Sequence, residues 1–397
     1  MSSSLDGSLF GVYIHFPYCR KRCPYCDFAT HAREHIPHER YADAVVHELA
    51  VRRPLYAGRT LRSVYFGGGT PGLWHADCVA RVLAAVLSAF PAHHPSLELT
   101  LEANPGELPP AQLAALRLAG INRLSLGVQS LEPRQLVTLG RLHGPGEPVE
   151  ATANARAAGF DNLSLDLMFG LPGQTLADLD RDLDGILALA PEHLSIYNLT
   201  VAERTPFGAM ERAGTLNLPD SGICADMFDR VRERTAAVGY EHYEISNFAK
   251  PGRRAVHNTL YWNGGEYLGL GSSSHSHHRL PDGSAERFST VRSVDDYFEQ
   301  VFKLPFEGAL AADPLVAMHE VITPEAAEKE ALWLGLRLLD GVERQAHARR
   351  HGMDPVERHG TEVARLVREG LLEVGGERVS LTHRGVLFAD EVGARFL

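Results

Sequence analysis

Three cysteines, Cys19, Cys23 and Cys26, lie within eight residues, directly after an apolar stretch that predicts a β-strand. This spacing restricts the chain more than any other feature, because one short loop must hold three thiols side by side. Thiolates are the usual ligands of iron–sulfur clusters. Three of them suit a four-iron cluster whose fourth iron has no protein ligand, and such an open iron can bind a small molecule.

Two other interpretations of the three cysteines remain open on the residues alone. The first is a zinc site, with His15, His31 or His35 as the fourth ligand. The second is a group of inert structural thiols. Cys78 and Cys224 are expected to be buried thiols, and the odd total of five cysteines argues against a disulfide framework and for a reducing compartment.

The composition predicts a cytoplasmic, globular protein. The 397 residues are 44% hydrophobic and 22% charged, which is enough for one large core and a second, smaller one. No run approaches the roughly 20 apolar residues of a membrane span, and the first residues, 1–7, lack the basic and apolar regions of a signal peptide. The net charge of −11 disfavours nucleic-acid binding, which depends on neutralising phosphates.

Short β-branched or aromatic runs alternate with helical patterns along the first 245 residues. This alternation is typical of βαβ units and predicts an α/β fold, a partial (βα)6 barrel of the TIM type. The predicted strands are 9–16, 62–66, 97–101, 123–128, 163–168, 194–199 and 240–245.

The polar residues of interest follow the carboxyl ends of these strands, where parallel barrels carry their chemistry. The cysteine loop follows the first strand and the glycine run 67–72 follows the second. Glu102 and Gln129 end the next two strands, and Asp166 lies near the end of the fifth. The glycines suit either a tight turn or the close approach of a ligand to the backbone. Glu102 can cap a turn before Pro105 or accept hydrogen bonds from two ribose hydroxyls.

The remaining two polar candidates also have two interpretations each. Arg141 is either a surface charge or part of a binding site. Asp166 lies in a strongly apolar context, Leu-Asp-Leu-Met, where an unpaired buried carboxylate would be costly, so we expect a partner or a ligand beside it.

The spacing C-x3-C-x2-C resembles that of the radical S-adenosylmethionine (SAM) superfamily. The resemblance implies that SAM chelates the open iron of a [4Fe-4S] cluster held by the three cysteines. It also implies that the glycine-rich strand end receives the methionyl amino group of SAM, and that further side chains line its pocket. The residues at the matching positions are Gly68, Gly69 and Thr70 for the strand end, Glu102, Gln129, Arg141 and Asp166 for the pocket, and Tyr13 and Tyr25 near the cluster.

Most of the chain, from Val12 to Leu397, resembles the group that contains oxygen-independent coproporphyrinogen III oxidase and the HemW-type haem chaperones. The matching motifs are Gly-Gly-Gly-Thr-Pro, Glu-Ala-Asn-Pro, Gly-Val-Gln-Ser and Gly-Leu-Pro-Gly-Gln-Thr. The oxidase carries a fourth cysteine two residues after the third, where this chain has Phe28. It also has a longer segment before the cluster, whereas only 18 residues precede Cys19 here. Both differences favour the chaperone.

The run His257-Asn-Thr-Leu-Tyr-Trp262 matches the His-Asn-x-x-Tyr-Trp motif of the haem chaperones. An imidazole is a common axial ligand of haem iron, and aromatic rings offer flat apolar surface to the macrocycle. We therefore expect His257 and Trp262 to contact haem; the alternative is a core histidine packed beside aromatic residues. A second group, His275, His277 and His278, is expected to form a mobile surface loop rather than a metal or haem contact.

The sequence predicts two domains, a radical SAM core over residues 1–290 and a C-terminal domain over 291–397. The second contains an apolar helix at 328–339, then a helix, a turn and a two-stranded wing, which together resemble a winged helix. Winged helices often bind DNA, but this chain is acidic and lacks a basic recognition helix. A lid, or a docking domain for a tetrapyrrole or a partner protein, is the favoured interpretation.

The sequence thus predicts a haem chaperone that binds a [4Fe-4S] cluster, SAM and haem as its cargo, and delivers haem to an acceptor protein not identified by the sequence. The acceptor can be membrane-associated although this chain has no membrane segment. The alternative is an oxygen-independent coproporphyrinogen III oxidase. If SAM is cleaved, an electron donor is also required; no catalytic residue and no nucleic-acid partner are predicted.

Overall fold

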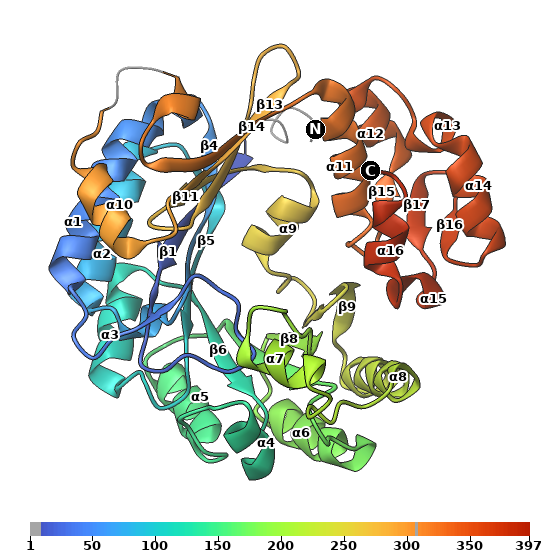
Figure 1. Cartoon of the computed structure of the whole chain (residues 1–397), viewed down its shortest axis with the longest axis horizontal. Coiled ribbons are helices and arrows are strands. Elements are labelled where there is room, and N and C mark those ends of the chain that lie inside the picture. Colours follow the sequence, from blue (N-terminus) through green and yellow to red (C-terminus); the bar gives the residue numbers. More distant parts are fainter. Residues whose placement is uncertain (1–8, 306–308) are drawn as a thin grey trace.

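The computed structural model describes residues 9–305 and 309–397. The prediction that the chain begins without a signal peptide rests on residues 1–7, which lie outside the described residues. One sheet of twelve strands dominates the larger part of the molecule, in the order β14-β13-β12-β11-β1-β4-β5-β6-β7-β8-β10-β9. Figure 1 shows this sheet curving around the larger, left-hand part of the molecule, with a smaller, mostly helical domain on the right.

The central strands of the sheet run parallel and confirm the predicted α/β partial barrel. Their alternate residues are apolar on the outer face, against the helices, and largely polar on the inner face, because strand side chains alternate with a period of two. The parallel strands are β11 (Glu266–Leu270), β1 (Leu9–Phe16), β4 (Thr60–Gly68), β5 (His93–Ala103), β6 (Arg123–Gln129), β7 (Leu163–Phe169) and β8 (His193–Asn198).

Helices cover the outer face of this sheet (Figure 1). They are α1 (His38–Arg52), α2 (Ala76–Ala89), α3 (Pro110–Ala119), α4 (Pro133–Thr138), α5 (Glu147–Ala157), α6 (Leu176–Ala188) and α8 (Ser221–Ala237). The short α7 (Pro206–Arg212) packs instead beside the cysteine loop, where the Phe207 N–H donates to the Pro24 carbonyl (3.0 Å). Local sequence fixes their ends. Helix α3, for example, has Pro110 in its first turn and ends at Gly120, whose φ of 112° suits glycine.

Antiparallel strands extend both edges of the sheet, and the sequence patterns did not predict most of them. On one edge lie β9 (Glu241–Glu244) and β10 (Asn247–Ala249); on the other lie β12 (His275–Arg279), β13 (Ala285–Thr290) and β14 (Val316–Ile322). The expected histidine loop is therefore wrong. Residues 275–279 pair with 285–289 along their full length, so backbone hydrogen bonds order them in spite of their polar composition.

The C-terminal domain has the predicted helical, winged-helix-like form. Its wing is formed by β16 and β17, with the short β15 alongside. The elements are α11 (Pro324–Gly335), β15 (Val342–Glu343), α12 (Arg344–His351), α13 (Pro355–Arg358), α14 (Gly360–Arg368), β16 (Leu372–Val374), β17 (Arg378–Leu381), α15 (His383–Val386) and α16 (Ala389–Ala394). The division at residue 290 stays a prediction; β14 and α10 (Val294–Val301), which follow it, pack on the barrel.

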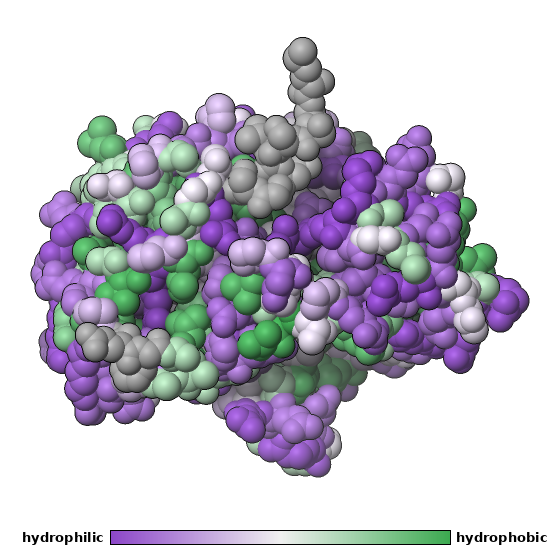
Figure 2. Space-filling model, turned by 90° about the horizontal axis from the view of Figure 1, so that it is seen from above, coloured by the Kyte–Doolittle hydropathy of each residue, from purple (hydrophilic) through white to green (hydrophobic). Residues whose placement is uncertain are grey.

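The C-terminal domain contacts the barrel through α9 (Val256–Trp262), which lies between the two parts in Figure 1. The Arg350 guanidinium donates hydrogen bonds to the carbonyls of Asn263 (2.7 Å) and Gly264 (2.6 Å), and Arg337 lies 4.7 Å above the Trp262 ring. Figure 2 shows that hydrophilic residues cover most of this domain on the upper face. Among the helices of the described part of the chain, none combines the length and the apolar character that crossing a bilayer requires.

Candidate functional site

The cysteine loop lies between β1 and α1, and a two-residue parallel bridge closes it. This bridge pairs β2 (Tyr18–Cys19) with β3 (His31–Ala32). All three thiols are free and half-buried. Within residues 9–305 and 309–397, no three His, Cys, Asp or Glu side chains converge closely enough for one metal ion. A four-iron cluster is larger than an ion, and its ligands lie further apart.

Of the three histidines suggested as the fourth zinc ligand, His15 already has both ring nitrogens hydrogen-bonded. His15 bonds the Ala29 carbonyl through Nε2 (3.0 Å) and the Tyr13 hydroxyl through Nδ1 (3.2 Å). Two polar groups approach the cysteine sulfurs instead: the Thr70 hydroxyl donates to Cys19 Sγ (3.6 Å) and Arg141 Nη1 donates to Cys23 Sγ (3.7 Å). Burial raises the pKa of the Cys19 thiol to about 11, so metal binding there must displace a proton.

The glycine-rich end of β4 packs directly on the cysteine loop. Gly69 N–H donates to the Phe16 carbonyl (2.7 Å) and Thr70 N–H to the Tyr18 carbonyl (2.9 Å). A Cβ atom added at Gly69 would lie 2.5 Å from the Tyr18 oxygen, and one at Gly68, whose φ is 113°, would lie 2.6 Å from the His15 ring. These positions therefore require glycine, as close backbone approach does.

Two carboxylates lie on the polar inner face of the barrel, as the sequence predicted from their strand ends. Glu102 accepts hydrogen bonds from the Tyr65 hydroxyl (2.6 Å) and the Gly68 N–H (3.2 Å), and Asp166 accepts one from Ser125 (3.1 Å). Burial raises the pKa of Glu102 to about 7 and that of Asp166 to about 6. Both line one inner cavity of about 240 Å³.

Gln129 and Arg141 carry buried polar atoms that have no hydrogen-bond partner among the described residues, the amide oxygen of Gln129 and Nε of Arg141. Gln129 has a φ of 67°, a left-handed conformation that is uncommon outside glycine and that often marks a functional site. Arg141 is held by the Gly127 carbonyl (2.6 Å) and by Asn104 (2.5 Å). The unpartnered atoms, the bare glycine backbone and Glu102 together fit a polar ligand such as SAM beside the three thiols.

A much larger cavity, of about 920 Å³, opens beside the cysteine loop between the barrel and the C-terminal domain. We call it the large cavity. Its walls combine aromatic rings, imidazoles and arginines, and Phe28, with 60% of its surface exposed, lies at its edge. Trp262 of α9 lines it as well, but His257 does not; His257 lines the inner cavity instead.

His257 is 1% exposed, and hydrogen bonds engage both of its ring nitrogens. Nδ1 pairs with the Ser63 hydroxyl (2.8 Å) and Nε2 with the Tyr261 hydroxyl (2.8 Å). The backbone N–H also donates to Glu98 (3.0 Å), and burial lowers the pKa of the ring to about 3. To bind haem iron, the His257 ring would have to lose one of these two hydrogen bonds. The structure therefore does not favour the predicted role of His257 as the axial haem ligand.

Comparisons with known proteins agree with this architecture. Residues 13–186 match the radical SAM superfamily and residues 322–388 match the HemN C-terminal domain. The heme chaperone HemW of Bacillus subtilis is 34% identical over 97% of this chain and 98% of its own length. HemW of Mycobacterium tuberculosis is 35% identical over 98% and 95%, respectively. The chain belongs to the HemW family of radical SAM proteins.

Among solved structures, the coproporphyrinogen III oxidase HemN of Escherichia coli, a radical SAM enzyme, superposes with a TM-score of 0.82 at 21% identity. The match covers 98% of this chain and 90% of that one, and it shows a shared fold. Membership of the radical SAM superfamily implies a [4Fe-4S] cluster and SAM as cofactors.

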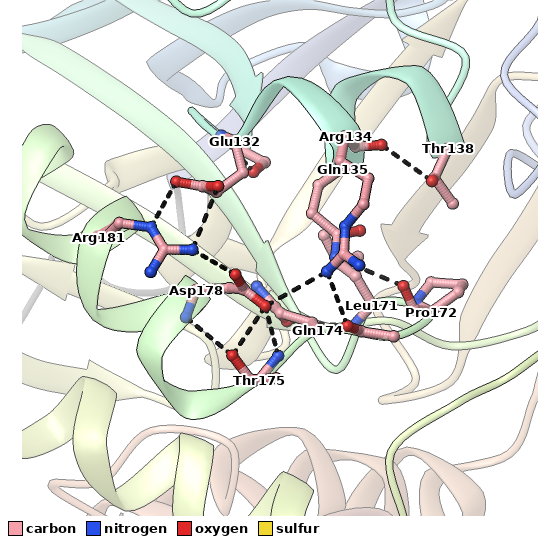
Figure 3. Close-up of polar contacts among 12 residues, drawn as sticks. Glu132, Arg134, Gln135, Thr138, Leu171, Pro172, Gln174, Thr175, Asp178 and Arg181 are labelled. Atoms are coloured by element: carbon pink, nitrogen blue, oxygen red, sulfur yellow. Dashed lines mark hydrogen bonds and ion pairs between the residues drawn. The ribbon is translucent and has the colours of Figure 1, made fainter.

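The family motif at residues 170–175 forms a turn that connects β7 to α6 (Figure 3). The Thr175 side chain and Asp178 form a reciprocal cap at the start of α6. Arg134 from α4 donates to the Gly173 carbonyl (2.9 Å) and contacts Asp178, which Arg181 also contacts. The motif is thus a structural support of the strand that carries Asp166.

Asp178→Ala should lower the free energy of unfolding at pH 7 by about 1–2 kcal/mol, as loss of a helix cap does. Although burial alone would raise it, hydrogen bonds from Thr175 and the guanidinium groups of Arg181 and Arg134 hold the pKa of Asp178 below its usual value. Its stabilisation is therefore present above about pH 4 and is lost as the pH falls further. Urea unfolding of parent and variant should converge at low pH; a constant difference would contradict this role.

Sequence reasoning missed several residues that complete these sites. Tyr65, Arg123 and Ser125 line the inner cavity, and Asn104 holds Arg141. Each of these four residues lies on, or directly after, a strand for which the sequence had already predicted another site residue. The alternation of polar with apolar residues along β4, β5 and β6 was the signal that could have found three of the four.

Proposed function

We propose that this chain is a haem chaperone that binds a [4Fe-4S] cluster, SAM and haem, and passes haem to an acceptor protein. The observation that carries the proposal is the large cavity beside the cysteine loop, in a chain that HemW of Bacillus subtilis matches over 97% of its length. The volume of about 920 Å³ lies at the upper end of the range of ligand pockets.

The walls of the large cavity suit a flat, apolar macrocycle with charged edges. Tyr261, Trp262, Tyr267 and Trp333 supply aromatic surface from both the barrel and the C-terminal domain. Four arginines and only two carboxylates line it, whereas the whole chain has a net charge of −11. A tetrapyrrole that carries carboxylates matches this combination.

The cofactors would occupy the adjoining strand ends. Cys19, Cys23 and Cys26 would hold the cluster, while Thr70 and Arg141 donate to the sulfurs. Gly68, Gly69, Glu102, Gln129 and Asp166 would bind SAM, with Tyr13 and Tyr25 beside them. When bound, the cluster and SAM together supply one-electron chemistry, for which an external electron donor is required. The protein orients both groups and excludes water.

The second candidate function is the oxidase reaction of HemN, which the shared fold and the HemN C-terminal domain favour. Phe28 argues against it, because an exposed phenylalanine stands where the oxidase has its fourth cysteine. We expect the reconstituted protein, with SAM and a reductant under anaerobic conditions, not to convert coproporphyrinogen III to protoporphyrinogen IX. The same preparation should bind about one haem per chain.

Chromatography of the tetrapyrroles and a haem titration, run side by side, test both functions. Escherichia coli HemN, assayed in parallel, shows that the reductant and substrate are competent. Loss of two carboxyl groups per turnover would make this chain an oxidase. Haem binding no tighter than that of an unrelated acidic protein would remove the chaperone proposal.

A further inference from the structure

Strand β12 presents two imidazoles, His275 and His277, to the large cavity. They are two residues apart and so share one face of the strand, while His278 points to the other face and pairs with Glu286 (3.0 Å). His277 lies opposite Tyr267 of β11, with 5.8 Å between the ring centroids. The imidazole of His277 therefore continues the aromatic wall of the cavity.

The hydrogen bonding of His277 leaves one ring nitrogen available to bind a metal. Its Nδ1–H donates to the Gly265 carbonyl (3.3 Å), while Nε2 has no partner among the described residues. Metal-binding histidines usually donate their other N–H in this way, which fixes the tautomer and the ring orientation. Burial, reinforced by Arg287 and Arg279, lowers the pKa of His277 to about 4, so the lone pair is free at neutral pH.

The other imidazoles near the cavity are less suited. His257 and His15 have both ring nitrogens engaged, and His278 faces away. His275 and His351 also line the cavity, and Nε2 of His351 is buried without a partner in the described part of the chain. No hydrogen bond within residues 9–305 and 309–397 fixes the tautomer of either ring, in contrast to His277.

Three arginines of the large cavity, Arg279, Arg292 and Arg350, have no carboxylate within ion-pair distance in the described part of the chain. The fourth, Arg287, pairs with Glu330 and Glu320. Arg279 and Arg350 converge on the same acceptor, the Gly264 carbonyl, at 2.5 and 2.6 Å. They come from the barrel and the C-terminal domain respectively, and Gly264 directly precedes the residue that orients His277. Arginine suits planar carboxylates because its donors match their geometry.

We propose that Nε2 of His277 is the axial ligand of the haem iron, and that Arg279 and Arg350 bind a carboxylate at the edge of the same macrocycle. This assignment rests on the proposed function, since it specifies how the large cavity recognises its cargo. The ligand class is an iron tetrapyrrole with free carboxylates.

The iron bond is tested with His277→Ala in the full, cluster-reconstituted chain. Ferric haem affinity should fall by more than about 10-fold, since even losing a group that merely orients a metal ligand costs that much. The Soret band should shift, and added imidazole should restore it. Affinity for metal-free protoporphyrin IX should fall much less, because that ligand has no iron to bind and loses only the contact with the imidazole ring. A merely structural role of His277 would weaken the binding of both ligands equally.

Matched variants locate the ligand. His257→Ala, His275→Ala and His351→Ala should keep the parent Soret position. A shift in any of them, with His277→Ala unaffected, overturns the assignment of His277 while leaving the haem-chaperone function intact. If the parent chain itself binds no haem, the proposed function fails, and this outcome is distinct from the first.

The carboxylate contact is tested with Arg279→Gln and Arg350→Gln, with the exposed Arg349→Gln as control. Each of the first two should weaken haem binding by about 10-fold, the size expected for a charged hydrogen bond. Neither should weaken binding of the haem dimethyl ester, which has no free carboxylate. Equal losses for haem and ester, or losses in Arg349→Gln, would overturn this part of the proposal.

Discussion

Replacing any one of Cys19, Cys23 and Cys26 by alanine should remove nearly all bound iron and the visible absorption of the reconstituted protein. The loop has three thiols and no fourth cysteine, because Phe28 stands at the next spacing. A cluster left with two protein ligands loses iron. Iron and sulfide analysis after anaerobic reconstitution, together with the absorption spectrum, measures the loss.

Cys78→Ala and Cys224→Ala are the matched controls. Cys78 donates to Glu39 (3.1 Å) on the helical side of the barrel, and Cys224 lies at the start of α8 near the Pro219 carbonyl (3.9 Å). Both controls should keep the full iron content. An undiminished iron content in all three loop variants would contradict the assignment of the cluster. Zinc in place of iron after a strictly anaerobic preparation would support the alternative of a zinc site.

Six of the seven parallel strands could be predicted from sequence, because apolar residues recur at every second position on their outer face. The seventh, β11, was not predicted. Of the antiparallel edge strands, only β9 lies within a predicted strand, 240–245. Strand β12 reads His-Ser-His-His-Arg, which resembles a surface loop by composition. Its order comes from pairing with β13, and polar side chains can face the large cavity there. The sequence of β12 alone shows neither its pairing with β13 nor the cavity beside it.

Some site residues could likewise be predicted from the sequence, and others could not. Glu102 and Asp166 were predictable, because a carboxylate at the end of an apolar strand is costly to bury unless a polar partner or a ligand meets it. The surroundings of His257 were not predictable. Its Nδ1 bonds Ser63, which lies 194 residues earlier in the chain, and a local motif carries no information on that contact. The motif lies on α9, but its sequence cannot show which imidazole near the large cavity keeps a free ring nitrogen.

Glu102→Ala should weaken SAM binding to the reconstituted protein by about 10-fold or more, since one hydrogen bond to a charged group contributes about 1.5–3 kcal/mol. Glu102 lies on the polar inner face next to the Gly68 N–H, and its carboxylate can accept bonds from two hydroxyls only when ionised. Equilibrium dialysis under anaerobic conditions measures the affinity. An unchanged affinity in this variant would place the ribose elsewhere.

The pH dependence of SAM binding distinguishes the titration of Glu102 from that of other ionisable groups. Burial raises the pKa of Glu102 to about 7, so the parent should lose SAM affinity as the pH falls from 8 to 6 and the acceptor becomes protonated. The amino group of SAM also titrates near this range, so the comparison is with Glu102→Gln, in which the carboxylate component must disappear. Glu48→Gln is the control, because burial raises the pKa of Glu48 to about 7 too. Glu48 lies on α1, bonds Gly271 and Tyr297, and does not line the inner cavity that contains Glu102. If Glu48→Gln, and not Glu102→Gln, flattened the profile, the titrating group would lie outside the SAM pocket.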